Sequence, residues 1–153
     1  MEKQQIAVLY EAYSKDVYRL ALSWLCCTYD AEDVLQTVFL KLLDKDVTVL
    51  QGSEKAWLLK CTANICKNHL RSFWRRNMQP IDEKIILPTD EDSFLWEALN
   101  KLKPKYRAVI HLYYYEGYKQ DEVAQILDIS RTAVQTRMQR AREFLKKELM
   151  ENE

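Results

Sequence analysis

The sequence predicts an all-α protein made of two small helical domains joined by an acidic linker. Only two glycines and three prolines occur among its 153 residues, which leaves few positions for the hairpin turns of a sheet. Apolar residues recur every three or four positions along most of the chain, as in amphipathic helices. Because 48% of the residues are hydrophobic and 30% are charged, we expect a globular chain with a buried core.

Several protein classes are disfavoured by the same sequence. The longest mainly apolar stretch, Leu20 to Cys27, is far shorter than the roughly 20 residues of a membrane span. The N-terminus does not have the layout of a signal peptide, so we expect a cytoplasmic protein without direct membrane insertion. The four cysteines lack the spacing of a zinc knuckle or a redox dithiol. This predicts buried thiols, with neither a metal nor a cofactor.

Charge is strongly segregated along the chain, although 23 basic and 23 acidic side chains balance. The segment from Lys55 to Arg76 is basic and contains no acidic residue, the segment from Asp82 to Glu97 is acidic, and the segment from Arg131 to Lys147 is basic again. Either basic segment alone would pass for a solvated helix face. Two of them on separate predicted helices favour a polyanion such as DNA as the binding partner.

The acidic segment coincides with the predicted domain boundary. Pro80 and Pro88 interrupt the helical pattern there, and we expect a first domain at residues 1–77, a linker at 78–92 and a second domain at 93–153. Each domain is near the lower size limit for a self-sufficient core. This small size is compatible with modest stability of each domain or with dependence on a larger partner.

The first half of the first domain is expected to form helices that pack against each other. Apolar residues between Ile6 and Leu25 predict one interrupted helix or two consecutive helices. Asp30 is the predicted N-cap of the next helix, because its carboxylate can accept free backbone N–H groups. That helix is predicted to bury Val34, Leu35, Val38, Phe39, Leu42 and Leu43.

The opposite face of this helix carries a mixed pattern, which we call the polar strip. Its four residues follow the helical spacing i, i+3, i+4 and i+7, and they are Asp33, Gln36, Thr37 and Leu40. An exposed leucine among polar residues is compatible with ordinary surface or with a docking site for another protein.

A third helix of about 23 residues is predicted after Ser53, its expected N-cap. Its packing stripe is expected to contain Trp57, Leu58, Cys61, Ile65, His69, Leu70 and Phe73. We call the other side the basic face, and it contains Lys60, Asn64, Lys67, Asn68, Arg71 and Arg75. Cations there would bind phosphates and carboxamides would pair with base edges, which predicts a nucleic-acid surface.

The second domain opens with the apolar pattern from Phe94 to Leu102 and is expected to start its next helix at Pro104. Gly117 is predicted to end that helix in a left-handed conformation. The following residues predict a helix at 119–127, a turn at 128–130 and a helix from Arg131 to about Met150, which is a helix-turn-helix.

The second helix of this motif is expected to read DNA. Ser130 can cap it, while Val134, Met138, Ala141, Leu145 and Leu149 are predicted to face the core. Its outer side, which we call the reading face, contains Thr132, Gln135, Thr136 and Gln139, flanked by Arg131, Arg137 and Arg140. Short polar groups beside arginines suit a major groove. An ordinary helical hairpin with a charged face is the alternative.

In order and spacing these motifs resemble the extracytoplasmic-function (ECF) group of bacterial RNA polymerase sigma factors, within the sigma-70 family. Asp30 to Phe39 resembles the acidic helix of that group, and Lys55 to Arg71 resembles its promoter-melting helix. Two segments, Leu99 to Tyr115 and Asp121 to Leu145, resemble its C-terminal helix-turn-helix domain. The resemblance covers nearly the whole chain.

The resemblance implies a role for each surface. The polar strip would bind the clamp of the largest subunit of core RNA polymerase, and the chain would also contact the flap of the second-largest subunit. The basic face would engage the −10 element as it opens, while the loop Asp46 to Gly52 would hold a flipped base. The reading face with its arginines would bind the −35 element as duplex promoter DNA. An anti-sigma factor is also implied, which could hold the chain at the membrane.

Some residues depart from the pattern of that group. Arg131-Thr132-Ala133 stands where relatives often have a run such as Glu-Gly-Thr, so the preferred −35 sequence cannot be transferred. Asp128 replaces a frequent glycine in the turn. Aspartate tolerates the left-handed conformation at some energetic cost.

Two other classes of function are compatible with the residues alone. A stand-alone helix-turn-helix transcriptional regulator would bind a palindromic duplex without polymerase and would use the first domain to dimerise or to sense a signal. An enzyme would need Asp30, Glu32 and Asp33 as a metal-binding set. Neither a Glu-x-x-His motif nor a glycine-rich loop accompanies these carboxylates, so the sequence predicts no catalytic residues.

Overall fold

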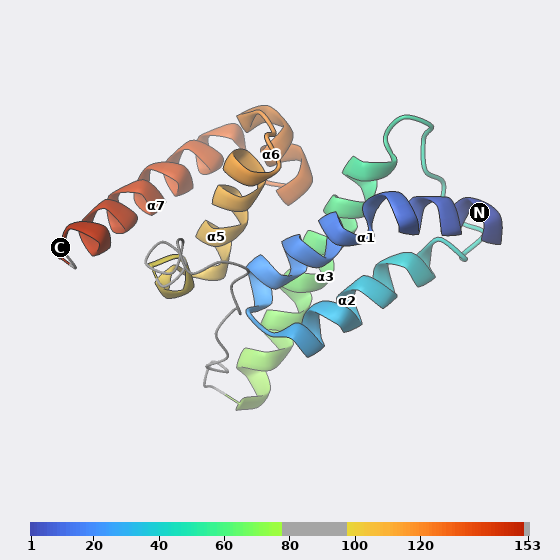
Figure 1. Cartoon of the computed structure of the whole chain (residues 1–153), viewed down its shortest axis with the longest axis horizontal. Helices are drawn as coiled ribbons and strands as arrows, with labels where there is room; N and C mark the ends of the chain where they lie inside the picture. Colours follow the sequence, from blue (N-terminus) through green and yellow to red (C-terminus); the bar gives the residue numbers. More distant parts are fainter. Residues whose placement is uncertain (78–97, 152–153) are drawn as a thin grey trace. The chain divides into compact units, whose positions relative to one another are not determined.

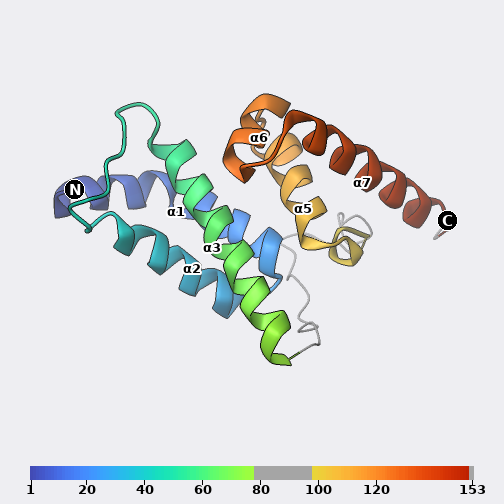
Figure 2. The same ribbon diagram turned by 180° about the vertical axis from the view of Figure 1, so that it is seen from behind.

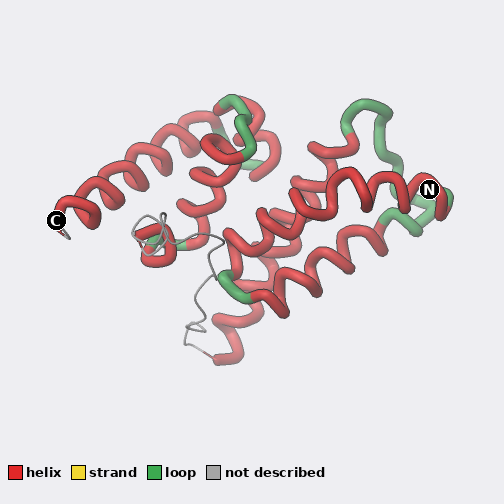
Figure 3. Tube along the Cα trace, viewed as in Figure 1, coloured by secondary structure: helices red, strands yellow, loops and turns green. Residues whose placement is uncertain are grey.

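The computed structural model describes residues 1–77 and 98–151, and every element in these two ranges is helical (Figure 3). The chain divides into two compact units, Met1–Ile81 and Asp82–Glu153. The all-α prediction is therefore confirmed, whereas the predicted linker at 78–92 lies outside the described residues. Within the described ranges, no helix combines the length and the apolarity needed to cross a lipid bilayer.

The first unit is a bundle of three helices, α1 (Lys3–Leu25), α2 (Thr28–Lys41) and α3 (Glu54–Asn77). Each helix packs against the other two, and the views from both sides show α1 alongside α2 and α3 (Figures 1 and 2). Burial of one side of each helix supplies most of the stabilising free energy of such a bundle. Its fully buried large side chains are Val17, Leu20, Val38, Leu42, Leu58 and Leu59.

The start of α2 differs from the prediction. The helix begins at Thr28 with Cys27 in the N-cap position, so Asp30 lies inside the first turn and is not the N-cap. The carboxylate of Asp30 instead lies 3.3 Å from Nε2 of His69 on α3. The pair joins α2 to α3 near the edge of the bundle, and a carboxylate in the first helical turn also suits the helix dipole.

The buried side of α3 is rotated from the predicted packing stripe. Leu58 is buried as expected, but its companions are Leu59, Thr62, Ala63 and Cys66. Of the predicted stripe, Trp57, Cys61, Ile65, His69 and Leu70 are only half-buried. Thr62 tolerates burial because its hydroxyl donates to the carbonyl of Leu58 at 2.7 Å, which satisfies the polar group within the helix.

The prediction of buried thiols holds for two of the cysteines. Cys27 and Cys66 are buried, while Cys26 and Cys61 are half-buried, and all four are free. Burial raises the pKa of the Cys66 thiol far above its ordinary value, and it also raises the pKa of Cys61. These thiols therefore stay protonated and behave as small apolar groups.

The second unit contains a helical turn at residues 98–101, then α5 (Pro104–Ile110), η2 (His111–Tyr115), α6 (Gln120–Leu127) and α7 (Arg131–Glu151). Pro104 occupies the first turn of α5, and Gly117 has a φ of 77°, as predicted. The π-helical segment η2 was not predicted, and it continues directly from α5. Figure 1 shows α5 and α6 packed near the start of the long helix α7.

Among the described residues of the second unit, Arg107 is the most buried cation, with an exposed fraction of 8%. Its Nη1 donates to the carbonyl oxygens of Leu102 at 2.7 Å and of Asn100 at 3.3 Å. These carbonyls belong to the end of the helical turn at 98–101, where helix geometry leaves acceptors without an intrahelical partner. Arg107 therefore ties the helical turn at 98–101 and the residue after it to α5.

Replacing Arg107 by methionine is expected to lower the free energy of unfolding of the second unit by about 2 kcal/mol, because hydrogen bonds to a charged donor are lost and buried carbonyls are orphaned. Urea denaturation monitored by circular dichroism measures the change. Arg131→Met is the matched control. Its ion pair with Asp121, at 3.3 Å, is exposed and should contribute little. Equal shifts for both variants would contradict the capping role.

Candidate nucleic-acid interface

The polar strip lies on the open side of α2. Asp33, Gln36, Thr37 and Leu40 are all exposed, and Leu40 has an exposed fraction of 62%. The Thr37 hydroxyl donates to the carbonyl of Asp33 at 2.8 Å, so this side chain lies along the helix. The strip therefore presents one carboxylate, one carboxamide and one bare leucine to its surroundings.

An apolar groove borders the polar strip. The sequence did not predict this groove. It is lined by Lys3 and Ile6 of α1, by Gln36, Phe39 and Leu40 of α2, and by Leu43. Leu43 was expected to be buried, but it follows the end of α2 at Lys41 and is 48% exposed. Gln36 and Leu40 belong to both features, so the strip and the groove form one continuous surface.

The basic face runs along one side of α3. Lys60, Asn64, Asn68 and Arg71 are exposed and Lys67 is half-buried, while the side chain of Arg75 lies outside the described part of the molecule. A single helix therefore holds three cations and two carboxamides on its outer side. The prediction that these residues face outward is confirmed for its described members.

The segment between α2 and α3 forms an exposed loop. Leu50 is 72% exposed, and Gly52 has a φ of 90°, which favours glycine. The backbone N–H of Gly52 donates to the carboxylate of Glu54 at 2.9 and 3.1 Å. This contact fixes the end of the loop against the first turn of α3, beside the basic face.

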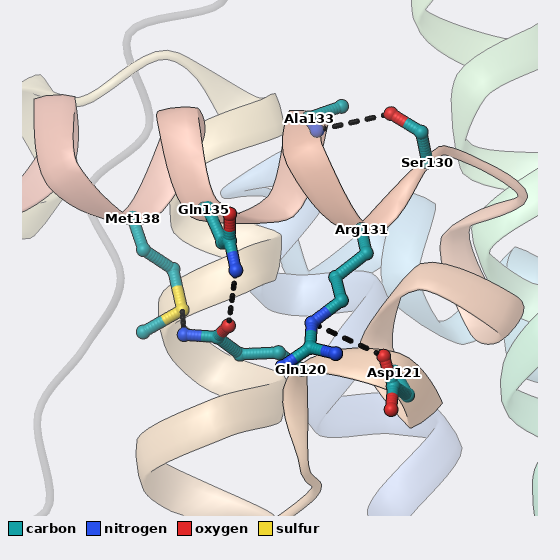
Figure 4. Close-up of polar contacts among 7 residues, drawn as sticks. All are labelled: Gln120, Asp121, Ser130, Arg131, Ala133, Gln135 and Met138. Carbon is teal, nitrogen blue, oxygen red and sulfur yellow. Dashed lines mark hydrogen bonds and ion pairs between the residues drawn. The ribbon is translucent and has the colours of Figure 1, made fainter.

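The helix-turn-helix has the predicted lengths. After α6 ends at Leu127, Asp128 adopts the left-handed conformation with a φ of 56°, and the N–H of Ile129 donates to the carbonyl of Ala124 at 3.0 Å. Ser130 then accepts a hydrogen bond from the N–H of Ala133 at 3.0 Å, the capping contact drawn in Figure 4. The turn and the cap together set the direction in which α7 leaves α6.

The start of α6 shows how a poor N-cap is compensated. Lys119 occupies the cap position, and a lysine side chain cannot accept hydrogen bonds. The carboxylate of Glu122 reaches back and accepts the backbone N–H of Lys119 at 3.0 Å. This is one half of a capping box.

Asp128→Gly is expected to stabilise the second unit by up to about 1 kcal/mol, because glycine adopts positive φ without the steric cost borne by an L side chain. Thermal denaturation of the full chain measures this as a higher Tm. Asp121→Gly is the contrasting variant. Asp121 lies in the first turn of α6, where glycine should be destabilising. A lower Tm for both variants would show that the aspartate side chain of the turn matters more than its backbone strain.

The reading face points away from the core of the second unit. Thr132, Gln135, Thr136 and Gln139 are exposed, whereas Val134, Met138 and Ala141 on the opposite side of α7 are buried. The predicted inward stripe does not continue along the whole helix. Leu145 is half-buried and Leu149 is 39% exposed, so the inward stripe becomes more accessible toward the end of α7.

One flank of the reading face lies against α6. The amide nitrogen of Gln135 lies 3.4 Å from the side-chain oxygen of Gln120, and the amide nitrogen of Gln120 lies 3.8 Å from the sulfur of Met138 (Figure 4). On the same flank, Nε of Arg131 lies 3.3 Å from the carboxylate of Asp121. These contacts place Arg131 and Gln135 beside α6 at the start of α7.

The other flank lies against α5, and there the predicted arginines differ in exposure. Arg140 is exposed and hydrogen-bonded to Tyr106, a contact that lowers the pKa of the phenol. Arg137 is half-buried beside the same tyrosine, and burial lowers the pKa of its guanidinium. Arg137 is therefore less accessible to DNA than its predicted place beside the reading face implied.

Comparison with known families assigns the two units separately. Residues 9–76 match the family described as Sigma-70 region 2, and residues 95–145 match the family described as Sigma-70, region 4. Among similar curated proteins, the ECF RNA polymerase sigma factor SigX of Bacillus subtilis is 27% identical, with 99% of this chain and 90% of that protein covered. The RNA polymerase sigma factor SigV of the same organism is 28% identical, with coverages of 90% and 86%.

The fold is also found among solved structures. The sigma factor RpoE from Bartonella quintana, solved in complex with the anti-sigma factor NepR, superposes with a TM-score of 0.77 at 24% identity. That match covers 97% of this chain and 96% of the other. CnrH, solved with the cytosolic domain of CnrY, gives a TM-score of 0.66 at 22% identity, with coverages of 99% and 92%.

Proposed function

This chain belongs to the ECF group of the sigma-70 family, and we propose how its surfaces let it direct bacterial RNA polymerase to specific promoters. The proposal assigns residues 1–77 to the polymerase clamp and the −10 element, residues 78–92 to a linker, and residues 93–153 to the −35 element. The chain acts as a non-catalytic subunit in the cytoplasm, where it meets the polymerase and the promoter. One observation carries the proposal: a chain of the sigma-70 family has two outward-facing surfaces suited to DNA, the basic face and the reading face.

In the first domain, the polar strip and the adjoining groove bind the clamp of the largest polymerase subunit. The exposure of Leu40 beside the apolar groove supports this role, because a leucine at the centre of a protein interface becomes buried on binding. The basic face then meets the −10 element, where Asn64 and Asn68 contact bases as the strands separate. Lys60, Lys67, Arg71 and Arg75 neutralise phosphates of the opening strand.

In the second domain, the reading face binds the −35 element in the major groove of intact duplex. Thr132, Gln135, Thr136 and Gln139 contact base edges, and Arg131, Arg137 and Arg140 contact phosphates. Docking of this domain on the flap of the second-largest subunit holds it at the correct distance from the −10 element. Separate domains allow one element to be melted while the other is read as duplex.

The balanced charge of the chain makes polymerase necessary for tight promoter binding. The acidic segment from Asp82 to Glu97 opposes the attraction between the two basic surfaces and DNA phosphates. An anti-sigma factor that covers these surfaces would keep the chain away from polymerase. RpoE of Bartonella quintana was solved in complex with the anti-sigma factor NepR, which supports an anti-sigma factor as a regulator of this chain.

Transcription in vitro tests the proposed function. Core RNA polymerase alone and core polymerase with the full chain are compared on promoters that carry matched or scrambled −35 and −10 elements. We expect specific initiation only with the chain present and only from matched promoters. Tight binding to a palindromic duplex without polymerase, together with no gain in initiation, would favour the stand-alone regulator instead.

A further inference from the structure

The start of α5 forms a cationic edge beside the reading helix. Lys103 and Lys105 are exposed, and the ammonium of Lys105 lies 5.2 Å from the centre of the Tyr106 ring. The hydroxyl of Tyr106 is hydrogen-bonded to Arg140, which belongs to the third turn of α7. Two lysines, a phenol and an arginine from two helices therefore meet at one place on the surface.

The two flanks of α7 differ in charge. On the α6 flank, Asp121 and Glu122 are exposed and Asp121 pairs with Arg131, which offsets the positive charge there. On the α5 flank, residues 98–115 contain no acidic residue. The half-buried guanidinium of Arg137, which interacts electrostatically with Tyr106, adds positive potential there. The α5 flank is therefore the better site for an anion.

A helix that lies in the major groove has a sugar–phosphate backbone on each side, because the groove is only about 12 Å wide. With the reading face against the bases, α6 would border one strand and the start of α5 would border the other. The hydrogen-bond chemistry suits this placement. Arg140 donates to the phenol oxygen of Tyr106, so the hydroxyl hydrogen of Tyr106 can point outward to a phosphate oxygen.

We propose that Lys103, Lys105 and Tyr106, together with Arg140, form a binding site for the DNA backbone phosphates that border the −35 element opposite α6. This inference rests on the proposed function and adds three residues that the sequence did not identify as DNA-binding. Phosphate contacts carry no base information. The site therefore sets the position and the affinity of the second domain on the duplex, while the reading face sets its sequence preference.

The test measures binding of a matched promoter by holoenzyme, assembled from core polymerase and the full chain, over a series of salt concentrations. Each lost phosphate contact should reduce the slope of log K against log salt by about 0.9. Lys105→Gln is expected to show this reduction, and Lys103→Gln/Lys105→Gln about twice as much. Lys15→Gln, at an exposed position in α1, is the matched control for charge.

The phosphates themselves are probed by replacing them one at a time with neutral methylphosphonates on each strand around the −35 element. At the contacted phosphate, this replacement should weaken the wild-type complex and leave the Lys105→Gln complex unchanged. Tyr106→Phe, which keeps the ring packing, should show the same insensitivity at an adjacent phosphate. Circular dichroism of each variant checks that the helices are intact.

The outcomes separate this inference from the proposed function. Unchanged salt slopes in both lysine variants, or altered preference for −35 bases, would overturn the phosphate site. Equal slopes for Lys15→Gln and Lys105→Gln would overturn it as well. The proposed function is judged by the wild-type chain alone, through the dependence of its binding on polymerase and on the −35 sequence.

Discussion

Replacing Leu40 by aspartate is expected to weaken binding of the chain to core RNA polymerase by roughly 100-fold, or about 3 kcal/mol. In the free chain, Leu40 is 62% exposed and lines the apolar groove between α1 and α2. Binding to the clamp would bury this side chain, and an aspartate there would lose the apolar contact and place an unpaired charge in the interface. Titration of labelled chain with core polymerase measures the dissociation constant.

Val8→Asp is the matched control for this experiment. Val8 lies on α1 with an exposed fraction of 65%, but it does not line the groove. The substitution introduces the same charge on an equally accessible aliphatic residue of the same domain. If both variants bind as tightly as the wild type, the polar strip is not the polymerase-binding surface.

Joint replacement of Asn64 and Asn68 by alanine is expected to reduce promoter opening by at least about 30-fold. Two base contacts would be lost, each contributing roughly 1 to 3 kcal/mol of discrimination. Both carboxamides are exposed on α3, so the substitution should leave the packing of the first domain intact. Permanganate reactivity of unpaired thymines in the −10 element, followed over time, measures the rate and extent of opening.

Two comparisons identify the step at which the asparagines act. A promoter with a pre-opened −10 bubble should restore most of the loss only if strand separation is the defect, whereas altered −10 bases should no longer affect the variant if base reading is lost. Lys60→Gln, on the same face, should weaken all promoters similarly and lower the salt dependence. If the double variant opens the promoter as fast and as far as the wild type, the basic face does not contact the −10 element as proposed.

The helix-turn-helix could be predicted because its determinants are local in the sequence. Ser130 caps α7 three residues before Ala133, and Gly117 and Asp128 mark the left-handed positions on either side of α6. Each of these signals acts within one helical turn, where residue identity and backbone geometry are directly linked. The exposed polar residues of the reading face followed from the same periodicity.

The sequence did not predict features that depend on contacts between different helices or on burial. Asp30 is a residue type that often caps helices, yet α2 begins earlier and the carboxylate pairs with His69. The buried side of α3 includes Thr62, which satisfies its hydroxyl within the helix and so resembles a surface residue in the sequence. Arg107 is buried because it caps a preceding helical turn, and no sequence pattern distinguishes it from a surface arginine.

The π-helical segment η2 holds one additional residue in the helix that begins with α5. A π turn accommodates one residue more than an α turn, so the additional residue is taken up within that turn. Deleting a single tyrosine from Tyr113–Tyr115 would therefore convert the segment to ordinary helix and leave Gly117 on about the same side of the helix axis. A one-residue deletion inside the regular helix α7 would instead rotate every later residue by roughly 100°. Single-residue deletions should therefore be tolerated better in η2 than in α7.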